Sequence, residues 1–197
     1  MWIFSTIFFD DSSFLINYIE SNNLLESKMD ILRVNQYSRI NAVNYATRYA
    51  LYPNPAFKYF PIINNSSGDC TNFVSQCLNA GNAPMNYNPN NPWWYNTRVH
   101  SWSQSWTVAH TLYWHLKVNA KNKSSGIKGL EVWNKQALEL GDLVFYENYQ
   151  GRIIHAAIIT AFKNNEPLVS HHSYEALNVS YQYTEEPNHP HFIKIII

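Results

Sequence analysis

The spacing of apolar positions changes along the chain, from a helical period in the first two thirds to short strand-like runs in the last third. In residues 70–81, CTNFVSQCLNAG, apolar side chains occupy positions 70, 73, 74, 77 and 78. This is the spacing of a helix with one buried stripe. It predicts a helix that begins at Cys70, with Asp69 as its N-cap and Gly81 as the left-handed residue that ends it.

Two other segments also have a helical pattern. Residues 38–51, SRINAVNYATRYAL, are followed by YPNP, whose prolines would end a helix. The apolar face of this first helix is expected to carry Ala42, Tyr45, Ala46 and Tyr49. A further helix is predicted over residues 108–119, with Thr107 as its cap.

After Glu139 the pattern consists of short runs rich in Val, Ile, Phe and Tyr: DLVFYE, RIIHAAIITAF, PLVSHHSY and HFIKIII. Turn residues separate these runs, as is typical of antiparallel strands. Helices followed by strands predict an α+β fold, in which N-terminal helices pack on a C-terminal antiparallel sheet. We expect one domain over residues 35–197, preceded by an N-terminal segment 1–34 of strand or short helices whose role is unassigned.

Composition and charge exclude two classes of partner. The chain has 14 Lys and Arg against 14 Asp and Glu, so no long-range field attracts nucleic acid or anionic lipid. The apolar start, MWIFSTIFF, is shorter than the roughly 18–20 residues of a membrane helix. It also lacks the basic region and cleavage site of a signal peptide. We expect a soluble protein with no nucleic-acid partner and no integral membrane segment.

The two cysteines lie on one predicted helix. Cys70 would occupy its first position, where unpaired amides and the helix dipole favour the nucleophilic thiolate. Cys77 follows two turns later, roughly 10 Å away, which is too far for a disulfide with Cys70. Neither a Cys-x-x-Cys motif nor a closed set of metal ligands is present. Cys70 is therefore a candidate nucleophile.

The predicted strands supply histidines that could act as the base for such a thiol. His155 lies in the apolar run IIHAAIIT, where an unpaired imidazole would cost about 1–3 kcal/mol. On the next strand, His171 and His172 should point to opposite faces, so only one of them can join His155 on the helix side. A cysteine or histidine alone is more often structural, but this ordered combination favours catalysis.

In order and spacing, these segments resemble the putative amidase domain family, related to the papain-like and NlpC/P60 cysteine hydrolases. The resemblance covers roughly residue 37 to the end, and is carried by AVNYATRYAL, NPAFKYF, GDCTNFVSQCLNAG, WWY, SQSWTVAHTLYWHL, GDLVFYE, HAAIIT and VSHHS. It implies a papain-like or NlpC/P60-like fold without cofactor or metal. It also implies a Cys-His-His site, with Cys70 as nucleophile, His155 as general base and His172 as third residue. Asn82 and His171 depart from the family pattern, and His171 leaves the choice of third residue open.

The expected function is hydrolysis of an amide or peptide bond through a thioester, with peptidoglycan among the candidate substrates. The substrate groove is expected to be lined by aromatic side chains: Trp93, Trp94, Tyr95 and Trp106. One alternative is a catalytically inactive peptide- or glycan-binding module on the same fold. Another is a metal site of Cys70, His155 and His172. The family resemblance favours the cell envelope or exterior of a bacterium, although no signal peptide is legible.

Overall fold

The computed structural model describes residues 16, 19–25, 37–63, 68–182 and 189–197. The chain forms two units, residues 1–36 and residues 37–197. In the first unit residues 19–25 are helical, and most of the segment predicted as strand or short helices lies outside the described residues. None of the helices described is long and apolar enough to cross a bilayer.

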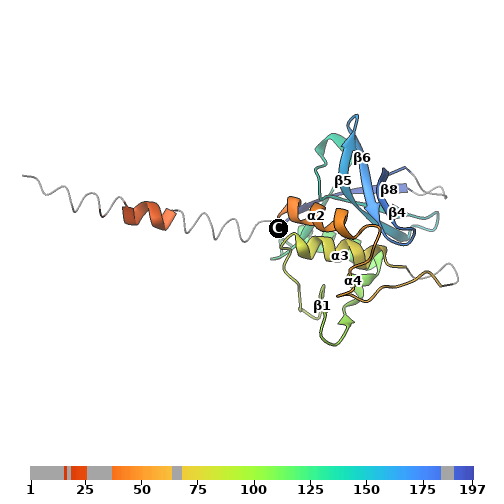
Figure 1. Cartoon of the computed structure of the whole chain (residues 1–197), viewed down its shortest axis with the longest axis horizontal. Helices are drawn as coiled ribbons and strands as arrows, with labels where there is room; N and C mark the ends of the chain where they lie inside the picture. Colours follow the sequence, from red (N-terminus) through yellow and green to blue (C-terminus); the bar gives the residue numbers. More distant parts are fainter. Residues whose placement is uncertain (1–15, 17–18, 26–36, 64–67, 183–188) are drawn as a thin grey trace, which may run out of the picture. The chain divides into compact units, whose positions relative to one another are not determined.

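Residues 37–197 have helices first and most strands last (Figure 1). The helices are α2 (Arg39–Tyr49), α3 (Cys70–Ala80), α4 (Gln104–Thr107), α5 (Ala109–Lys121) and the single-turn η1 (Lys135–Ala137). The strands are β1 (Tyr95–Asn96), β2 (Ser101–Trp102), β3 (Lys128–Val132), β4 (Leu143–Glu147), β5 (Ile153–Lys163), β6 (Glu166–His171), β7 (Ala176–Ser180) and β8 (His189–Ile196). The predicted α+β class is confirmed.

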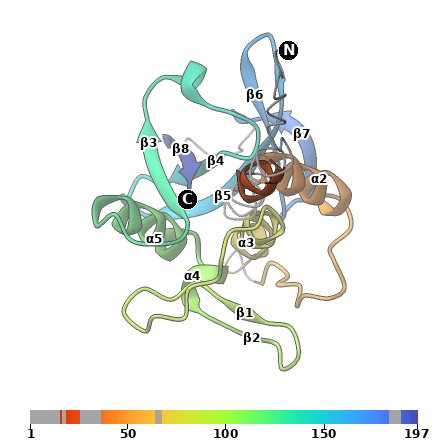
Figure 2. The ribbon, with the colours of Figure 1, turned by 90° about the vertical axis from the view of Figure 1, so that its left-hand side faces the viewer.

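The six longer strands form one sheet in the order β3-β8-β4-β5-β6-β7, and every neighbouring pair is antiparallel. Two of these strands, β3 and β7, were not predicted from the sequence. Both lie at an edge of the sheet, where a strand has one partner and a weaker apolar pattern. The short β1–β2 ribbon lies on the side of α3 away from this sheet (Figure 2).

Each face of the sheet carries its own core. The larger core joins the sheet to the helices through residues such as Phe73 and Leu78 of α3, and Phe145 and Ala156 of the central strands. Side chains that alternate with these along β4 and β5 point the other way and form a smaller core with β6 and the chain after β7. Figure 2 shows α3 between α2 and α5, close to the central strands.

The ends of the helices differ in detail from the prediction. Asp69 precedes α3, but its side chain makes no capping hydrogen bond. The left-handed residue after α3 is Asn82 (φ 67°), whereas Gly81 has φ −76°. Gly81 is needed for space instead, because a Cβ there would lie 2.5 Å from the Tyr37 ring. Thr107 ends α4 and does not cap α5, which begins after Val108.

Candidate active site

The Cys70 thiol lies where the start of α3 meets strand β5. Cys70 is the first residue of α3 and is 7% exposed. Its Sγ is 3.6 Å from Oγ1 of Thr71, and the backbone N–H of Ala156 also hydrogen-bonds to it. The registered pairs of β5 and β6 stop at Ile158–Ser170, so the amide of Ala156 lies beyond that pairing and faces the thiol.

His155 is the neighbour of Ala156, and its ring contacts two other rings. It lies directly across from Tyr146 of β4, with ring centroids 5.6 Å apart. The ring of His171 meets it edge-on at 4.8 Å. Tyr146 belongs to the smaller core, and side chains directly opposite each other in a sheet share a face. His155 and His171 therefore lie together on the face away from the helices.

His172 lies on the helix face in a different environment. Its ring stacks on Phe73 of α3, with centroids 4.1 Å apart. Nδ1–H donates to Oδ2 of Asp69 at 2.6 Å, and Nε2–H donates to the carbonyl of Tyr49 at 2.8 Å. Both nitrogens face acceptors, so both hydrogen bonds form when the ring is an imidazolium paired with the Asp69 carboxylate.

Asp69 is the other half of this buried pair, since its side chain and that of His172 are each 1% exposed. Besides His172, the carboxylate accepts from the Phe60 backbone N–H at 3.0 Å and from Nδ2 of Asn72 at 2.9 Å. A buried charge needs several such partners to offset its lost hydration. These bonds use the carboxylate that the sequence predicted as a helix cap.

These positions correct the predicted arrangement of the histidines. His171 and His172 do point in different directions, as strand alternation requires, but the ring beside His155 is that of His171. His172 was expected there, and lies instead against Phe73 and Asp69. The sequence could not decide between the two, because both faces of the sheet are buried at this point.

Burial sets the protonation of the candidate groups. Desolvation raises the pKa of the Cys70 thiol above its ordinary value, and the hydrogen bonds from Thr71 and Ala156 oppose this only in part. Desolvation also lowers the pKa of His155 and of His171 to about 4. At neutral pH the thiol and both imidazoles are therefore uncharged, contrary to the thiolate expected from the helix start. Within the described residues, no imidazole nitrogen hydrogen-bonds to Sγ.

The aromatic residues predicted to line a substrate groove are mostly in the core. Trp93 and Trp106 have no exposed surface, and Tyr95 is 3% exposed. The two indole N–H groups donate to α3, to Ser75 Oγ at 3.0 Å and to Asn72 Oδ1 at 2.9 Å respectively. Of the predicted set only Trp94 is partly exposed, and it stacks against Tyr87. Trp93 and Trp106 thus pack against α3, and the three buried side chains leave no surface for a substrate.

The alternative metal site also lacks the required geometry. In the part of the chain that the structure describes, no group of three or more His, Cys, Asp or Glu side chains is arranged to hold a metal ion. The two nitrogens of His172 are directed to Asp69 and to the Tyr49 carbonyl rather than toward Cys70.

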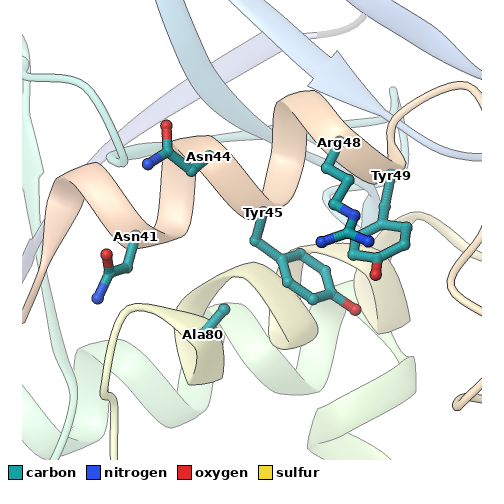
Figure 3. A pocket seen from close by; sticks show the side chains of 6 residues that line it. All are labelled: Asn41, Asn44, Tyr45, Arg48, Tyr49 and Ala80. Atoms are coloured by element: carbon teal, nitrogen blue, oxygen red, sulfur yellow. The ribbon is translucent and has the colours of Figure 1, made fainter.

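A surface pocket lies along α2, where side chains of this helix face Ala80 of α3 (Figure 3). Its lining residues are Asn41, Asn44, Tyr45, Arg48 and Tyr49 of α2, with Ala80 of α3. None of the candidate catalytic residues lines it. The hydroxyl of Tyr45 already donates to Gln76 Oε1 at 2.6 Å and accepts from Asn54. The pocket is therefore separate from the candidate active site.

Comparison with known proteins gives one family and two relatives. Residues 36–194 match the family model described as "Putative amidase domain". The chain is 37% identical over 172 residues to the uncharacterized protein YhbB of Bacillus subtilis (strain 168), covering 85% of this chain and 50% of YhbB. It is 32% identical over 159 residues to the uncharacterized protein YjcM of the same organism, covering 76% of this chain and 34% of YjcM. The chain thus spans half or less of these relatives, and no solved structure matches it.

Proposed function

The chain belongs to the family of putative amidase domains, and we propose that it hydrolyses amide or peptide bonds with Cys70 as the nucleophile. The observation that supports this most directly is the thiol at the start of α3, hydrogen-bonded to the backbone next to His155. The ring of His155 lies on the other face of β5, so the proposal requires this ring to turn toward Sγ at the start of the strand when substrate binds. The proposal includes a papain-like arrangement, in which a helix presents its first residue to a sheet that carries the imidazole.

The proposed reaction starts from neutral groups. As Sγ bonds to the carbonyl carbon of the substrate, the thiol proton passes to a ring nitrogen of His155. The C–N bond then breaks, and the same proton goes to the leaving amine. Water then attacks the thioester carbonyl and gives one proton to His155. As the C–S bond breaks, His155 passes this proton to Sγ, which releases a carboxylic acid and restores the free thiol. The low pKa of His155 leaves this ring unprotonated and able to accept a proton at neutral pH.

We assign the second imidazole of the site to His171, because its ring contacts that of His155. Nδ1–H of His171 donates to the backbone carbonyl of His172 at 3.3 Å, which fixes the tautomer and leaves Nε2 as an acceptor. An acceptor beside His155 can orient that ring as the third group of a catalytic triad does. His172 then acts through the fold, by holding Asp69.

The proposed substrate is a peptide or amide, with peptidoglycan peptides as the first class to test. Purified protein would be incubated with peptidoglycan fragments and with simple peptide amides, and the products identified by mass spectrometry. We expect an amine and a carboxylic acid, released by the wild type and not by Cys70→Ala. Product release that survives Cys70→Ala would show that Cys70 is not the nucleophile.

A binding module without catalysis is the second candidate, and the raised pKa of the Cys70 thiol is the observation that favours it. The two candidates differ in their reaction with an electrophilic amide or ester probe. An enzyme should form a thioester at Cys70 and release it again, whereas a binding module should react no faster than an ordinary buried thiol.

A further inference from the structure

The turn after β6 supplies a hydroxyl group to the start of α3. Oγ of Ser173 accepts from the backbone N–H of Asp69 at 2.7 Å and from that of Cys70 at 3.2 Å. The first amides of a helix have no partner within the helix, and a side-chain oxygen usually comes from the residue just before it. Here a residue more than 100 positions later does this.

The backbone of this turn is strained. Ser173 has φ 63° and the next residue, Tyr174, has φ 85°, in the region that non-glycine residues seldom adopt. Each such residue costs on the order of 1–3 kcal/mol and persists where the surrounding structure imposes it. Tyr174 is 73% exposed, so its own packing does not explain the strain. The turn provides the contact of Ser173 with the start of α3, in addition to a hydrogen bond that Glu175 accepts from Tyr59.

The lack of a side chain at Gly68 leaves room for Ser173. A Cβ at position 68 would lie 2.3 Å from Oγ of Ser173 and 3.1 Å from its Cβ, and the backbone there has φ 141°. The glycine of the Gly68-Asp69-Cys70 segment is thus required by the serine that approaches it. His172 and Ser173 together contact Asp69 and Cys70, through the ion pair and through the two amides.

We propose that Ser173 is a positioning residue for Cys70. By accepting from both amides, it fixes the peptide units on either side of Asp69, and so keeps Sγ of Cys70 at the Ala156 amide. Removal of the hydroxyl should let the first turn of α3 shift, so that Sγ loses this hydrogen bond and its alignment for attack. The inference rests on the proposed function for its effect on turnover, but not for its effect on the thiol itself.

Two substitutions of Ser173 separate positioning from stability. Ser173→Gly removes the hydroxyl but suits a positive φ, whereas Ser173→Thr keeps a hydroxyl but adds a branched Cβ that disfavours this φ. Both would be made in a Cys77→Ala background, so that Cys70 is the only thiol. Tyr174→Gly is the matched control, because it relieves strain in the same turn and leaves the Ser173 contact in place.

The readouts are kcat, KM, the pH dependence of Cys70 alkylation by iodoacetamide, and the urea midpoint. For Ser173→Gly we expect kcat to fall about tenfold or more with KM nearly unchanged. Its alkylation midpoint should also rise, because the thiolate loses the Ala156 donor. Ser173→Thr should keep most of kcat and the wild-type alkylation midpoint despite a lower urea midpoint. Tyr174→Gly should change neither rate nor alkylation.

The inference is overturned if kcat and alkylation follow the urea midpoint across the variants, with Ser173→Thr worse than Ser173→Gly. It is also overturned if Ser173→Gly alkylates with the wild-type pH profile. If the wild type turns over no substrate, the proposed hydrolase function fails, and the alkylation profiles still decide the role of Ser173.

Discussion

His171 and His172 are adjacent in the chain, yet their rings lie in opposite surroundings on the two faces of the sheet. On the helix face, His172 bonds through both nitrogens, to the Asp69 carboxylate and to a backbone carbonyl. On the other face, His171 and His155 contact each other's rings, and burial lowers the pKa of both to about 4. A carboxylate partner therefore distinguishes the two environments.

This difference suggests that the histidine on one face of β6 has a structural role and those on the other face a catalytic role. A histidine whose two nitrogens are both bonded to fixed acceptors cannot exchange a proton with a substrate without breaking the structure around it. A neutral imidazole with a free nitrogen can accept one. The helix face thus holds the start of α3 in place, and the other face carries the candidate base.

The largest effect should follow removal of the groups that take part in bond making. Cys70→Ala and His155→Ala are each expected to lower kcat by about a thousandfold or more, with little change in the urea midpoint. Cys77→Ala is the control on the same helix: it should keep kcat and lose about 1 kcal/mol or slightly more of stability, as a fully buried group. The reverse result for the two cysteines would assign the nucleophile to Cys77.

His172→Ala tests the structural role of the histidine on the helix face, and its effect is measured as a change in the free energy of unfolding. The substitution leaves the Asp69 carboxylate buried without its charged partner, which typically costs about 3–5 kcal/mol. His171→Ala, which breaks no ion pair, should cost under about 1.5 kcal/mol. Urea unfolding of the two variants measures the difference directly.

A double-mutant cycle gives the control for that prediction. Asp69→Asn combined with His172→Ala should be less destabilising than the sum of the single variants, because the buried charge is removed with its partner. Equal stabilities for His171→Ala and His172→Ala would show that Asp69 and His172 do not form a charged pair.

His171→Ala should act mainly on the reaction. Loss of the ring that orients His155 is expected to lower kcat by roughly 10- to 100-fold, less than loss of His155 itself. His171→Asn is the matched variant, since its side chain can still offer an acceptor to His155. A kcat for His171→Ala equal to that of the wild type would remove His171 from the proposed site.

The pH dependence of stability tests whether three buried histidines are neutral in the folded protein. His155, His171 and His115 each have a pKa lowered by burial from 6.5 to about 4. Between these values the unfolded chain binds more protons than the folded one, so the free energy of unfolding should fall as the pH drops from about 6.5 to about 4. It should be nearly independent of these groups above that range. Denaturant titrations at several pH values measure it.

His115 provides the control for this pH effect. It lies on α5 and bonds to Asn91 and Asn119, away from the candidate site. His115→Asn should flatten the pH dependence of stability and leave that of kcat unchanged, whereas His155→Ala should affect both. If stability were constant between pH 4 and 6.5, His115, His155 and His171 would not be held neutral by burial.

The sequence predicted those parts of the molecule whose pattern is local. Helix α3, with Cys70 as its first residue, and strands β4, β5 and β8 follow from apolar periods over 5–11 residues. The edge strands β3 and β7 were missed, because a strand with one neighbour needs no strong period. The burial of Trp93 and Trp106 was also missed, because a tryptophan in a Pro- and Asn-rich loop suits a groove as well as a core.

Contacts between segments that are far apart in the chain could not be predicted from the local sequence pattern. The bonds of Asp69 and Cys70 to His172 and Ser173 join positions more than 100 residues apart. A single sequence contains no period that would reveal them. Asp69 was assigned the ordinary role of a helix cap for this reason, whereas in the structure its carboxylate pairs with His172. Gly68, which was assigned no role from the sequence, leaves room for the Ser173 hydroxyl.

The smallest expected effect is a shift in the pKa of the Cys70 thiol. This shift tests most directly whether the candidate catalytic groups are uncharged at rest. In a Cys77→Ala background, alkylation of the folded protein by iodoacetamide should have a midpoint above that of a free thiol, about 8.5, because desolvation raises the pKa of Cys70. The same chain in urea should return to the ordinary value, which controls for the reagent. A midpoint clearly below 8.5 in the folded state would mean that a thiolate is stabilised by an imidazolium. His155 would then be charged at rest, and the two faces of β6 would not differ in the way proposed.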